Sequence, residues 1–579
     1  MNNTTNLSSF IWSVADLLRG SYKQSDYGKV ILPFTVLRRL DCILESTKEQ
    51  VLIEFKKRTS EGVDPTPFLT RIAKQSFYNS SPLDLNKSLA QPTQIRPNLL
   101  SYINGFSSNV GDIFEKYEFD DQIKKLEEAE LLYLVAKKFA EINLHPDQVS
   151  NSDMGLVFEE LIRKFAELSN ETAGEHFTPR EVIRLMVDLL FHGDNEALIK
   201  PGVIRTLYDP TAGTGGMLSI AEEYLTGSNG LNPDATLIVS GQELNPESYA
   251  ICKGDMLIKG QDVSNIKFGD TLKNDGHAGA KFDYGLSNPP FGVEWKKSEK
   301  EVKDEYEKLG FAGRFGPGLP RISDGSLLFL LHLISKMREP EKGGGRIAIV
   351  FNASPFYTGG AGSGESEIRR WIIEQDLLET IIGLPTDMFY NTGISTYIWV
   401  LSNHKTKVRR GKIQLINATD FFQKMHKSLG SKRKELGNDH IEQIIKLYGA
   451  FEENEHSKIF DAQEFCYTTV TVERPLKDEN GDIVLLARGK NKGKPQPDPG
   501  LRDTENIPFQ EDIGEYFKRE VLPHAPDAWI DHEKSKIGYE IPFTRHFYVF
   551  KPLRPLSEID AELKQTTDKI LEMIKGLSE

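Results

Sequence analysis

The spacing of hydrophobic and polar positions divides the chain into three regions. Over residues 1–150 apolar side chains recur every three to four positions, as at Val14, Leu17 and Leu18, which is the spacing of an amphipathic helix. The pattern predicts a helical N-terminal domain. Because no cluster of catalytic residue types lies within it, we interpret this region as a packing or partner domain.

In the second region, 151–470, short β-branched and aliphatic runs alternate with amphipathic stretches. This alternation is typical of a parallel sheet covered by helices, so the predicted fold class is α/β. The expected strands lie at 203–209, 236–244, 266–270, 282–288, 346–352, 378–384, 396–403 and 412–418. We expect the last two strands to form a hairpin.

The third region, 471–579, is a C-terminal extension. Its segment 475–506 is rich in Pro, Gly and charged residues, which predicts an exposed hairpin or linker. The tail carries apolar residues near one helical face, among them Leu556, Ile559, Leu563 and Ile570. Such a stripe packs either on its own domain or against a helix of a partner, and the sequence leaves both readings open.

Composition narrows the class of protein. The three cysteines lie far apart without a CxxC pair, which excludes a disulfide scaffold and a cysteine zinc site and suits a reducing cytoplasm. We find no HExxH motif, no EF-hand loop, no secretion signal and no run of 18 apolar residues, so we expect a cytoplasmic protein without a metal site or a membrane span.

The chain is acidic, with 71 basic against 85 acidic residues and a formal charge of −14. This balance argues against a general nucleic-acid coat but is compatible with a local basic groove, because phosphate binding depends on where charges lie. The stretch 405–412, which we expect near the catalytic edge, is the first candidate for phosphate contact. The stretches 427–433 and 487–494 rank below it, and a solvated loop is the alternative for all three.

The first expected strand ends in a glycine turn, DPTAGTGG (209–216). A tight glycine turn that opens a helix lets backbone N–H groups approach a ligand closely. The next strand ends at Glu243, where a carboxylate can accept hydrogen bonds from ribose hydroxyls, and the third ends at Asp270. The glycine turn and these carboxylates together indicate a nucleoside-containing cofactor. The chain has no GxxxxGK[ST] motif, which excludes a Walker-type ATP motor.

Asn288 stands at the end of the fourth expected strand, before Pro289, Pro290 and Phe291. Two prolines cannot continue a central strand, because they lack N–H groups and fix φ. The resulting rigid corner holds the Asn288 side chain and the Pro289 carbonyl side by side, as two acceptors suited to the N–H bonds of an exocyclic amine. Phe291 offers a face on which a base can stack. Taken alone, Asn-Pro-Pro can also be an ordinary turn.

The order FTPR, DPTAGTGG, QEL, GDTL, NPPF resembles amino-methyltransferases that use S-adenosylmethionine. More narrowly, the chain resembles the modification (DNA adenine-N6 methyltransferase) subunit of type I restriction-modification systems, through GEHFTPREVIRLMVDLL (174–190), the helical front and residues 383–403. NPPF occurs as NPPY in glutamine-N5 protein methyltransferases, so the motif indicates an amine and not DNA. The helical front and FTPR favour DNA adenine.

The resemblance implies a role for each matching residue. The methionine end of S-adenosylmethionine would contact Phe177, Thr178 and Pro179 and be lined by Asp209, Thr211, Gly213, Thr214, Gly215 and Gly216. The ribose would bind Glu243, and the adenine amino group of the cofactor would bind Asp270. The target adenine would be held by Asn288, Pro289, Pro290 and Phe291.

The resemblance also implies an architecture and partners. It implies a seven-stranded Rossmann-like methyltransferase domain between the helical N-terminal domain and the C-terminal extension. The substrate would be double-stranded DNA with the adenine flipped out of the helix. A separate specificity subunit, binding two copies of this chain, would choose the sequence, and a motor-nuclease subunit would perform restriction.

Other activities remain open or are excluded. A cysteine nucleophile for cytosine C5, commonly preceded by Pro, is excluded because Asp41, Ile251 and Phe465 precede the three cysteines. The remaining alternatives are an amino-methyltransferase acting on protein glutamine or RNA, and a catalytically inactive scaffold subunit.

Overall fold

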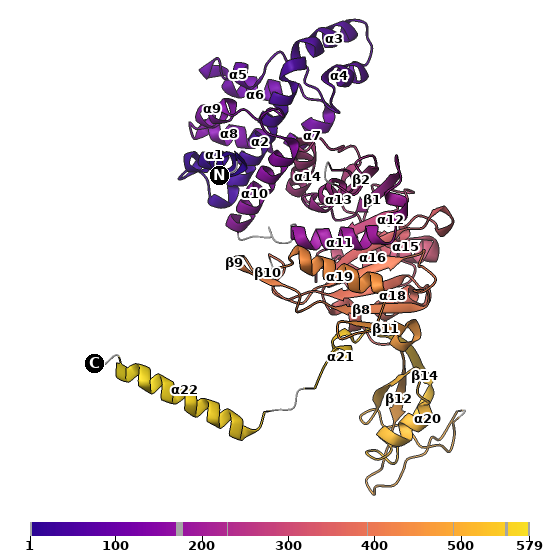
Figure 1. Ribbon diagram of the computed structural model, residues 1–579. Helices are drawn as coiled ribbons and strands as arrows, with labels where there is room; N and C mark the ends of the chain where they lie inside the picture. The colour runs from indigo at the N-terminus through magenta and orange to yellow at the C-terminus, as the bar shows by residue number, and fades with distance from the viewer. Residues whose placement is uncertain are drawn as a thin grey trace. The chain divides into compact units, whose positions relative to one another are not determined.

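A computed structural model describes residues 3–169, 178–227, 230–390, 392–489, 491–550 and 554–576 (Figure 1). The chain forms two compact units, Met1–Ile541 and Pro542–Glu579, and each is described by itself below.

The N-terminal region of the first unit is built from helices, as its hydrophobic spacing predicts. They are α1 (Asn3–Leu18), α2 (Tyr27–Leu44), α3 (Lys48–Ser60), α4 (Thr66–Ala73), α5 (Leu85–Ser88), α6 (Ile95–Ile103), α7 (Ser108–Lys116), α8 (Phe119–Glu128) and α9 (Leu132–Glu141). Helix α2 is the central one, because nearly all of its side chains are buried.

A nine-stranded sheet forms the middle of the unit, and all eight strands expected from the sequence are found in it. The strands are β1 (Ile204–Asp209), β2 (Thr236–Glu243), β3 (Ile266–Phe268), β4 (Tyr284–Ser287), β5 (Arg346–Phe351), β6 (Leu378–Gly383), β7 (Tyr397–Ser402), β8 (Lys412–Asn417) and β11 (Ser457–Asp461). Their order is β11-β8-β6-β7-β5-β4-β1-β2-β3, with β7 and β11 antiparallel to their neighbours. The fold class is confirmed, whereas the expected number of seven strands is wrong.

The expected hairpin of β7 and β8 is also wrong. Strand β7 inserts between β5 and β6, and β8 pairs in parallel with β6. The connection between them therefore passes over β6 at one edge of the sheet, and long-range pairing overrides the short connection on which the prediction relied.

The chain reverses direction across the sheet at β1. Strands β2 and β3 lie on one side of β1, and β4 and β5 lie on the other. Helices connect these strands: α13 (Gly216–Thr226) follows β1, α14 (Pro246–Ile258) follows β2 and α16 (Ser326–Ser335) precedes β5. In such sheets ligands bind outside the carboxyl ends of the strands at the point of reversal. We call this end, where β1, β2, β4 and β5 finish, the carboxyl edge, and the opposite end the amino edge.

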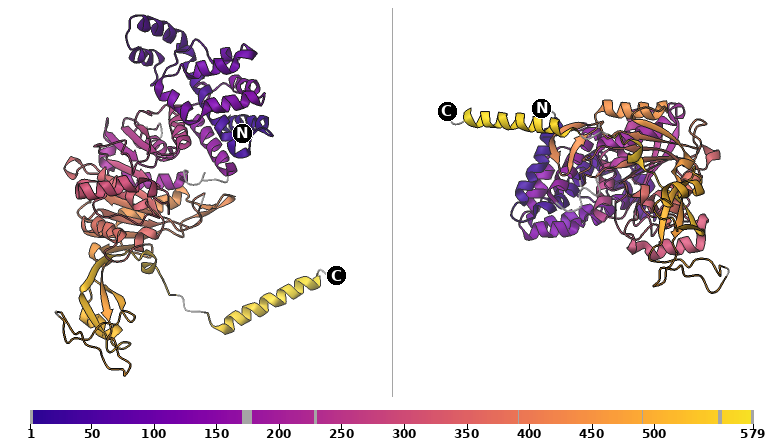
Figure 2. Two further views of the ribbon diagram at one scale, coloured as in Figure 1. Left: turned by 180° about the vertical axis from the view of Figure 1, so that it is seen from behind. Right: turned by 90° about the horizontal axis from the view of Figure 1, so that it is seen from below.

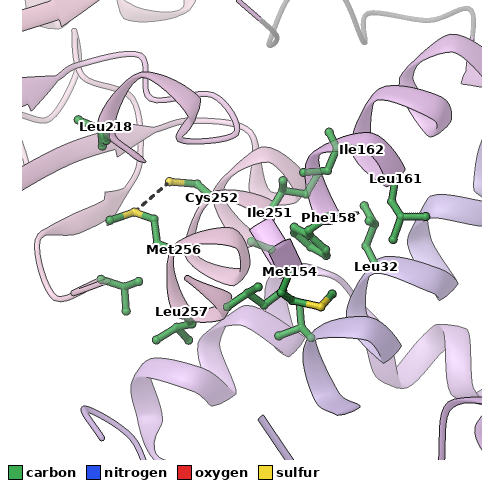
Figure 3. Close-up of a cluster of buried hydrophobic side chains, with 14 of the residues drawn as sticks. Leu32, Met154, Phe158, Leu161, Ile162, Leu218, Ile251, Cys252, Met256 and Leu257 are labelled. Atoms are coloured by element: carbon green, nitrogen blue, oxygen red, sulfur yellow. Dashed lines mark hydrogen bonds between the residues drawn. The ribbon is translucent and has the colours of Figure 1, made fainter. Parts of the chain in front are cut away.

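Helix α10 (Asn151–Ser169) joins the helical region to the sheet. Figure 3 shows Met154, Phe158 and Ile162 of α10 among the apolar side chains that also include Ile251 and Leu257 of α14. Polar contacts join α14 to α7 as well: Asp112 accepts from Tyr249 Oη at 2.6 Å and from Lys253 Nζ at 2.9 Å. The helical region is thus fixed to the helix that follows β2.

A smaller antiparallel sheet follows the central one. It consists of β12 (Cys466–Glu473) between β13 (Asp503–Pro508) and β14 (Trp529–Tyr539), and it extends away from the central sheet in Figure 2. Helix α18 (Gly364–Glu374) meets β14, where Arg369 Nε donates to the Tyr539 carbonyl at 2.6 Å. The segment between β12 and β13 makes isolated antiparallel bridges such as Lys477 to Ile483, in line with the predicted exposed hairpin.

The second unit holds α21 (Phe543–His546) and α22 (Leu556–Gly576). Apolar side chains of α22 are exposed, with Leu563 60% and Met573 72% accessible. Among the described helices none has the length and apolar character that crossing a bilayer requires.

Candidate functional site

A cavity of about 440 Å³ opens at the carboxyl edge, at the reversal point of the sheet. Residues from all five predicted motifs line it: Thr178, Asp209, Thr211, Gly213, Thr214, Gly216, Glu243, Asp270, Asn288 and Pro290. Motifs that are up to about a hundred residues apart in sequence therefore meet at one site, because the parallel strands that carry them end at the same edge.

The glycine turn after β1 has the backbone that its sequence predicts. Gly213 and Gly215 have φ of 55° and 81°, values that L-residues rarely adopt. A Cβ at Gly215 would also lie 2.6 Å from Cys252 Sγ on α14. Gly215 does not line the cavity, so its role in this structure is to let the turn pack against α14.

Two carboxylates flank this turn. Glu243 accepts from Gly213 N at 2.8 Å and from Asn245 N at 2.7 Å, one bond at each oxygen. Asp209 accepts from Thr211 N at 2.9 Å. Burial raises the pKa of Asp209 to about 7; the hydrogen bond from Thr211 opposes this shift and the charge of Glu243 adds to it. Each carboxylate oxygen has a second lone pair, so both groups keep capacity for a ligand.

Asp270 follows β3 and is held by three donors. Its Oδ1 accepts from Leu272 N at 2.9 Å and from Lys273 N at 3.3 Å, and its Oδ2 accepts from Ser298 Oγ at 2.6 Å. The carboxylate is therefore fixed in orientation while it lines the cavity.

Asn288 lies directly after β4, and Thr178 positions its side chain. Asn288 Nδ2 donates to Thr178 Oγ1 at 3.0 Å, and this bond joins the NPPF and FTPR motifs in space. The other side-chain atom, Oδ1, is buried and has no hydrogen-bond partner among the described residues. An unsatisfied buried acceptor costs free energy unless a ligand satisfies it. The site therefore presents an acceptor for an N–H group.

Several predicted residues do not line the cavity. Pro179 and Pro289 are buried and Phe291 is partly buried against the core, and none of the three contributes to the lining. Phe177 falls outside the described residues.

The sequence did not predict the other lining residues, among them Glu159, Asp255, Lys259 and Phe329. Glu159 pairs with Arg180 of the FTPR motif at 2.9 Å, and burial raises its pKa although Arg180 opposes this. From the amphipathic spacing of this helix, the sequence predicts that the Glu159 side chain is exposed to solvent. Only the packing of α10 against α14 turns it toward the cavity, and no spacing in the sequence signals that packing.

The basic stretches lie at different ends of the sheet. The stretch 405–412 connects β7 to β8 at the amino edge, because Ser402 pairs with Arg346, the first residue of β5. Its expected place near the catalytic edge is therefore wrong. Within it Lys405 pairs with Asp376 at 2.6 Å and Arg409 is buried. The stretch 427–433, which ranked lower, follows β8 and lies at the carboxyl edge.

Comparisons with known proteins agree with the resemblance seen in the sequence. The profile of the family described as N-6 DNA methylase matches residues 149–480, and that of the HsdM N-terminal domain matches residues 7–139. The methylase subunit of the type I restriction enzyme MjaIX from Methanocaldococcus jannaschii is 27% identical, over 89% of this chain and 87% of that protein. The methylase subunit of EcoKI from Escherichia coli is 27% identical over 52% of this chain and 54% of its own.

Solved structures share the fold. The type I restriction-modification methyltransferase subunit from Streptococcus thermophilus superposes with a TM-score of 0.63 at 24% identity, covering 80% of this chain and 97% of its own. A chain from a structure on the assembly and conformational transition of the type I R-M system superposes with a TM-score of 0.52 at 19% identity. The superposition covers 100% of this chain and 99% of that chain.

Proposed function

Because the chain belongs to the N-6 DNA methylase family, we propose that it is the modification subunit of a type I restriction-modification complex. In that role it transfers a methyl group from S-adenosylmethionine to N6 of adenine in double-stranded DNA. The observation that carries the proposal is the unpartnered Oδ1 of Asn288, which lines one cavity together with the glycine turn and Glu243.

The cavity suits the charge of the proposed cofactor. Its lining includes five carboxyl groups, those of Glu159, Asp209, Glu243, Asp255 and Asp270, against one ammonium group, that of Lys259. S-adenosylmethionine carries a sulfonium and an ammonium group, and carboxylates within about 4–6 Å stabilise such cations. The cofactor supplies an activated methyl group when bound.

The positions of the lining residues support the roles proposed for them. Glu243 would accept hydrogen bonds from the ribose hydroxyls, and Asp270 would accept from the adenine amino group of the cofactor. The exposed Leu244, 59% accessible between them in sequence, gives the purine ring an apolar face. The methionine end would lie against Thr178 on one side and against Asp209, Thr211, Gly213, Thr214 and Gly216 on the other, since all of these residues line the cavity.

Asn288 and Pro289 would hold the target amine. The target base leaves the duplex at a cost of a few kcal/mol, and Phe291 and Pro290 offer it apolar surface. Asn288 Oδ1 and the Pro289 carbonyl would accept the two N–H bonds, which turns the nitrogen lone pair toward the methyl group. Positioning would then carry the reaction: the N–C bond would form as the S–C bond of the donor breaks, and the amine would release one proton.

The substitution Asn288→Ala tests this function. The chain, assembled with its specificity subunit, is incubated with labelled S-adenosylmethionine and DNA from a host that lacks this gene. We expect the variant to lose roughly 10²–10³-fold in methylation rate, as when one preorganised hydrogen-bonding group is removed from an active site. Donor affinity, measured by calorimetry, should stay within a few-fold of the wild type.

Asn352→Ala is the matched control, because Asn352 follows β5 at the same edge and does not line the cavity. Unchanged methylation in Asn288→Ala would favour a scaffold role. Methyl transfer by the wild-type assembly to RNA or protein glutamine, with none to DNA, would favour the other alternative.

We further propose that α22 seats against a helix of the specificity subunit. Its apolar side chains, which include Leu556, Leu563, Ile570, Leu571, Met573 and Ile574, are each more than half exposed, and a helix with such a stripe buries it against a partner. Two copies of this chain would bind one specificity subunit, with a motor-nuclease subunit added for restriction. A chain ending at Phe550 should fail to copurify with the specificity subunit, and native mass spectrometry of the intact assembly should show two copies of this chain.

A further inference from the structure

A two-stranded hairpin projects from the carboxyl edge and has no part in the site described above. Strand β8 runs parallel to β6, so its last residue, Asn417, lies at the carboxyl edge. The chain then forms β9 (Gln423–Leu429) and β10 (Lys432–Glu435), which pair only with each other among the described strands. Figure 1 shows this hairpin projecting beside α11 (Arg180–His192).

The base of the hairpin is fixed next to the catalytic motifs. Lys432 is buried and forms an ion pair with Glu181. Glu181 lies three residues after Thr178, and the Thr178 hydroxyl group accepts the hydrogen bond from Asn288. The backbone N–H groups of Arg433 and Lys434 donate to the Asp387 carbonyl, at 2.9 and 3.2 Å. The hairpin therefore keeps a defined position relative to the cavity.

The outer part of the hairpin is positively charged. Lys424, Lys427 and Arg433 are exposed, as is His426, and the three cations form no ion pair with residues in the described parts of the chain. The one acid of the two strands, Glu435, accepts from Gln423 at 2.9 Å. In a chain with a formal charge of −14, this concentration of free cations at the catalytic edge is an electrostatic signal for a polyanion.

We propose that the β9–β10 hairpin contacts the phosphates that flank the methylated adenine. The inference rests on the proposed function: a duplex whose base is bound at Asn288 carries its sugar–phosphate backbone across the carboxyl edge, where the hairpin projects. Phosphate contacts orient the duplex without reading its sequence. The β9–β10 hairpin thus orients the duplex at the cavity, and the specificity subunit chooses the DNA sequence.

The test compares two variants with the same change of charge. One carries Lys424→Gln, Lys427→Gln and Arg433→Gln. The control carries Lys407→Gln, Arg410→Gln and Lys412→Gln, three exposed cations at the amino edge. Each is assembled with the specificity subunit and bound to a labelled duplex that carries the target site, mapped by sequencing methylated host DNA, at salt concentrations from about 50 to about 200 mM.

Each lost phosphate contact lowers the slope of log affinity against log salt by about 0.9. The hairpin variant should therefore show a slope shallower by about 3, so that the wild type loses roughly 40-fold more affinity over this salt range. The control should follow the wild type, and thermal melting and donor binding should be equal in all three proteins. A hairpin variant with the slope of the control overturns the inference, and so does an affinity loss without a change in slope.

The two proposals fail differently. If the wild-type assembly methylates DNA and the hairpin variant binds DNA as the wild type does, only the proposed phosphate contact of the β9–β10 hairpin is refuted. If the wild-type assembly does not methylate DNA at all, the proposed function itself fails.

Discussion

The two edges of the central sheet use the same residue types in opposite ways. At the amino edge Glu379 lies against Arg346 at 3.2 Å and Arg409 at 3.6 Å and accepts from Tyr448. At the carboxyl edge Asp209 and Glu243 receive backbone and hydroxyl donors and no described cation. Glu379 is thus neutralised by cations of the same chain. Asp209 and Glu243 keep the capacity to bind a cationic ligand, although two other acids of the cavity, Glu159 and Asp255, pair with Arg180 and Lys259.

The pKa values differ in the same sense. Burial opposes ionisation of Glu379, yet the guanidinium groups of Arg346 and Arg409 outweigh burial and lower its pKa. For Asp209 burial prevails, and its pKa rises to about 7. A buried carboxylate that is paired with cations of the same chain contributes to stability. A buried carboxyl group without such a cation marks a site where a ligand can supply the opposite charge.

The largest effect on stability should come from Glu379→Gln. The change leaves the buried guanidinium groups of Arg346 and Arg409 without a counter-charge, and breaking a buried ion pair by removing one partner costs about 3–5 kcal/mol. We expect the free energy of unfolding in urea to fall by that amount. Donor binding should persist in the folded protein, because the cavity lies at the other edge.

Glu299→Gln provides the control. It breaks an exposed helical pair with Lys303, and such pairs contribute about 0.3–0.5 kcal/mol. Equal losses in the two variants would mean that the pairing at the amino edge adds no more than an exposed pair does.

Gly215→Ala should have the next largest effect, because the carboxyl edge depends on backbone shape. An alanine at φ of 81° costs about 1–2 kcal/mol, and its Cβ would overlap Cys252 Sγ, which adds about 1–3 kcal/mol. We expect a loss of about 2–5 kcal/mol in unfolding free energy. Gly216→Ala is the matched control, since its Cβ would meet only Ile183 Cδ1 at 3.6 Å. If both variants were equally stable, the strain assigned to Gly215 would be absent.

The sequence predicts the strands of the central sheet well and the smaller sheet poorly. Strands such as β5 and β7 are apolar on both faces because helices or neighbouring elements cover them, and this leaves a continuous hydrophobic run. Strands β13 and β14 are largely exposed, so the period-two signal is weak. The partner of β8 could not be predicted, because strand pairing depends on contacts between distant segments.

The candidate site divides in the same way. Motifs at strand ends could be placed together from the sequence because parallel strands share an edge. The hydrogen bond from Asn288 to Thr178 and the entry of Glu159 into the cavity depend on how α10 and α11 pack. Nothing local in the sequence specifies either of them.

The smallest of these effects concerns the pH dependence of donor binding. With a pKa of about 7, Asp209 is mostly protonated below that pH, and a cationic donor favours the ionised form. We expect donor affinity, measured by calorimetry, to rise up to tenfold per pH unit as the pH approaches 7 from below and to level off above it, which is about 1.4 kcal/mol per unit.

Asp209→Asn should flatten this profile, and any slope that remains belongs to other groups of the donor or the cavity. The same raised pKa has a second consequence for the protein without donor. Since the folded-state value exceeds the unfolded value of about 3.9, the native state binds the proton more tightly, and this contribution to stability is lost as the pH rises through about 7. The melting temperature of the wild type should therefore fall relative to that of Asp209→Asn as the pH rises from about 3.9 to about 7. Parallel melting curves would show that Asp209 is ionised throughout, and the contrast between the two edges would then rest on hydrogen bonding alone.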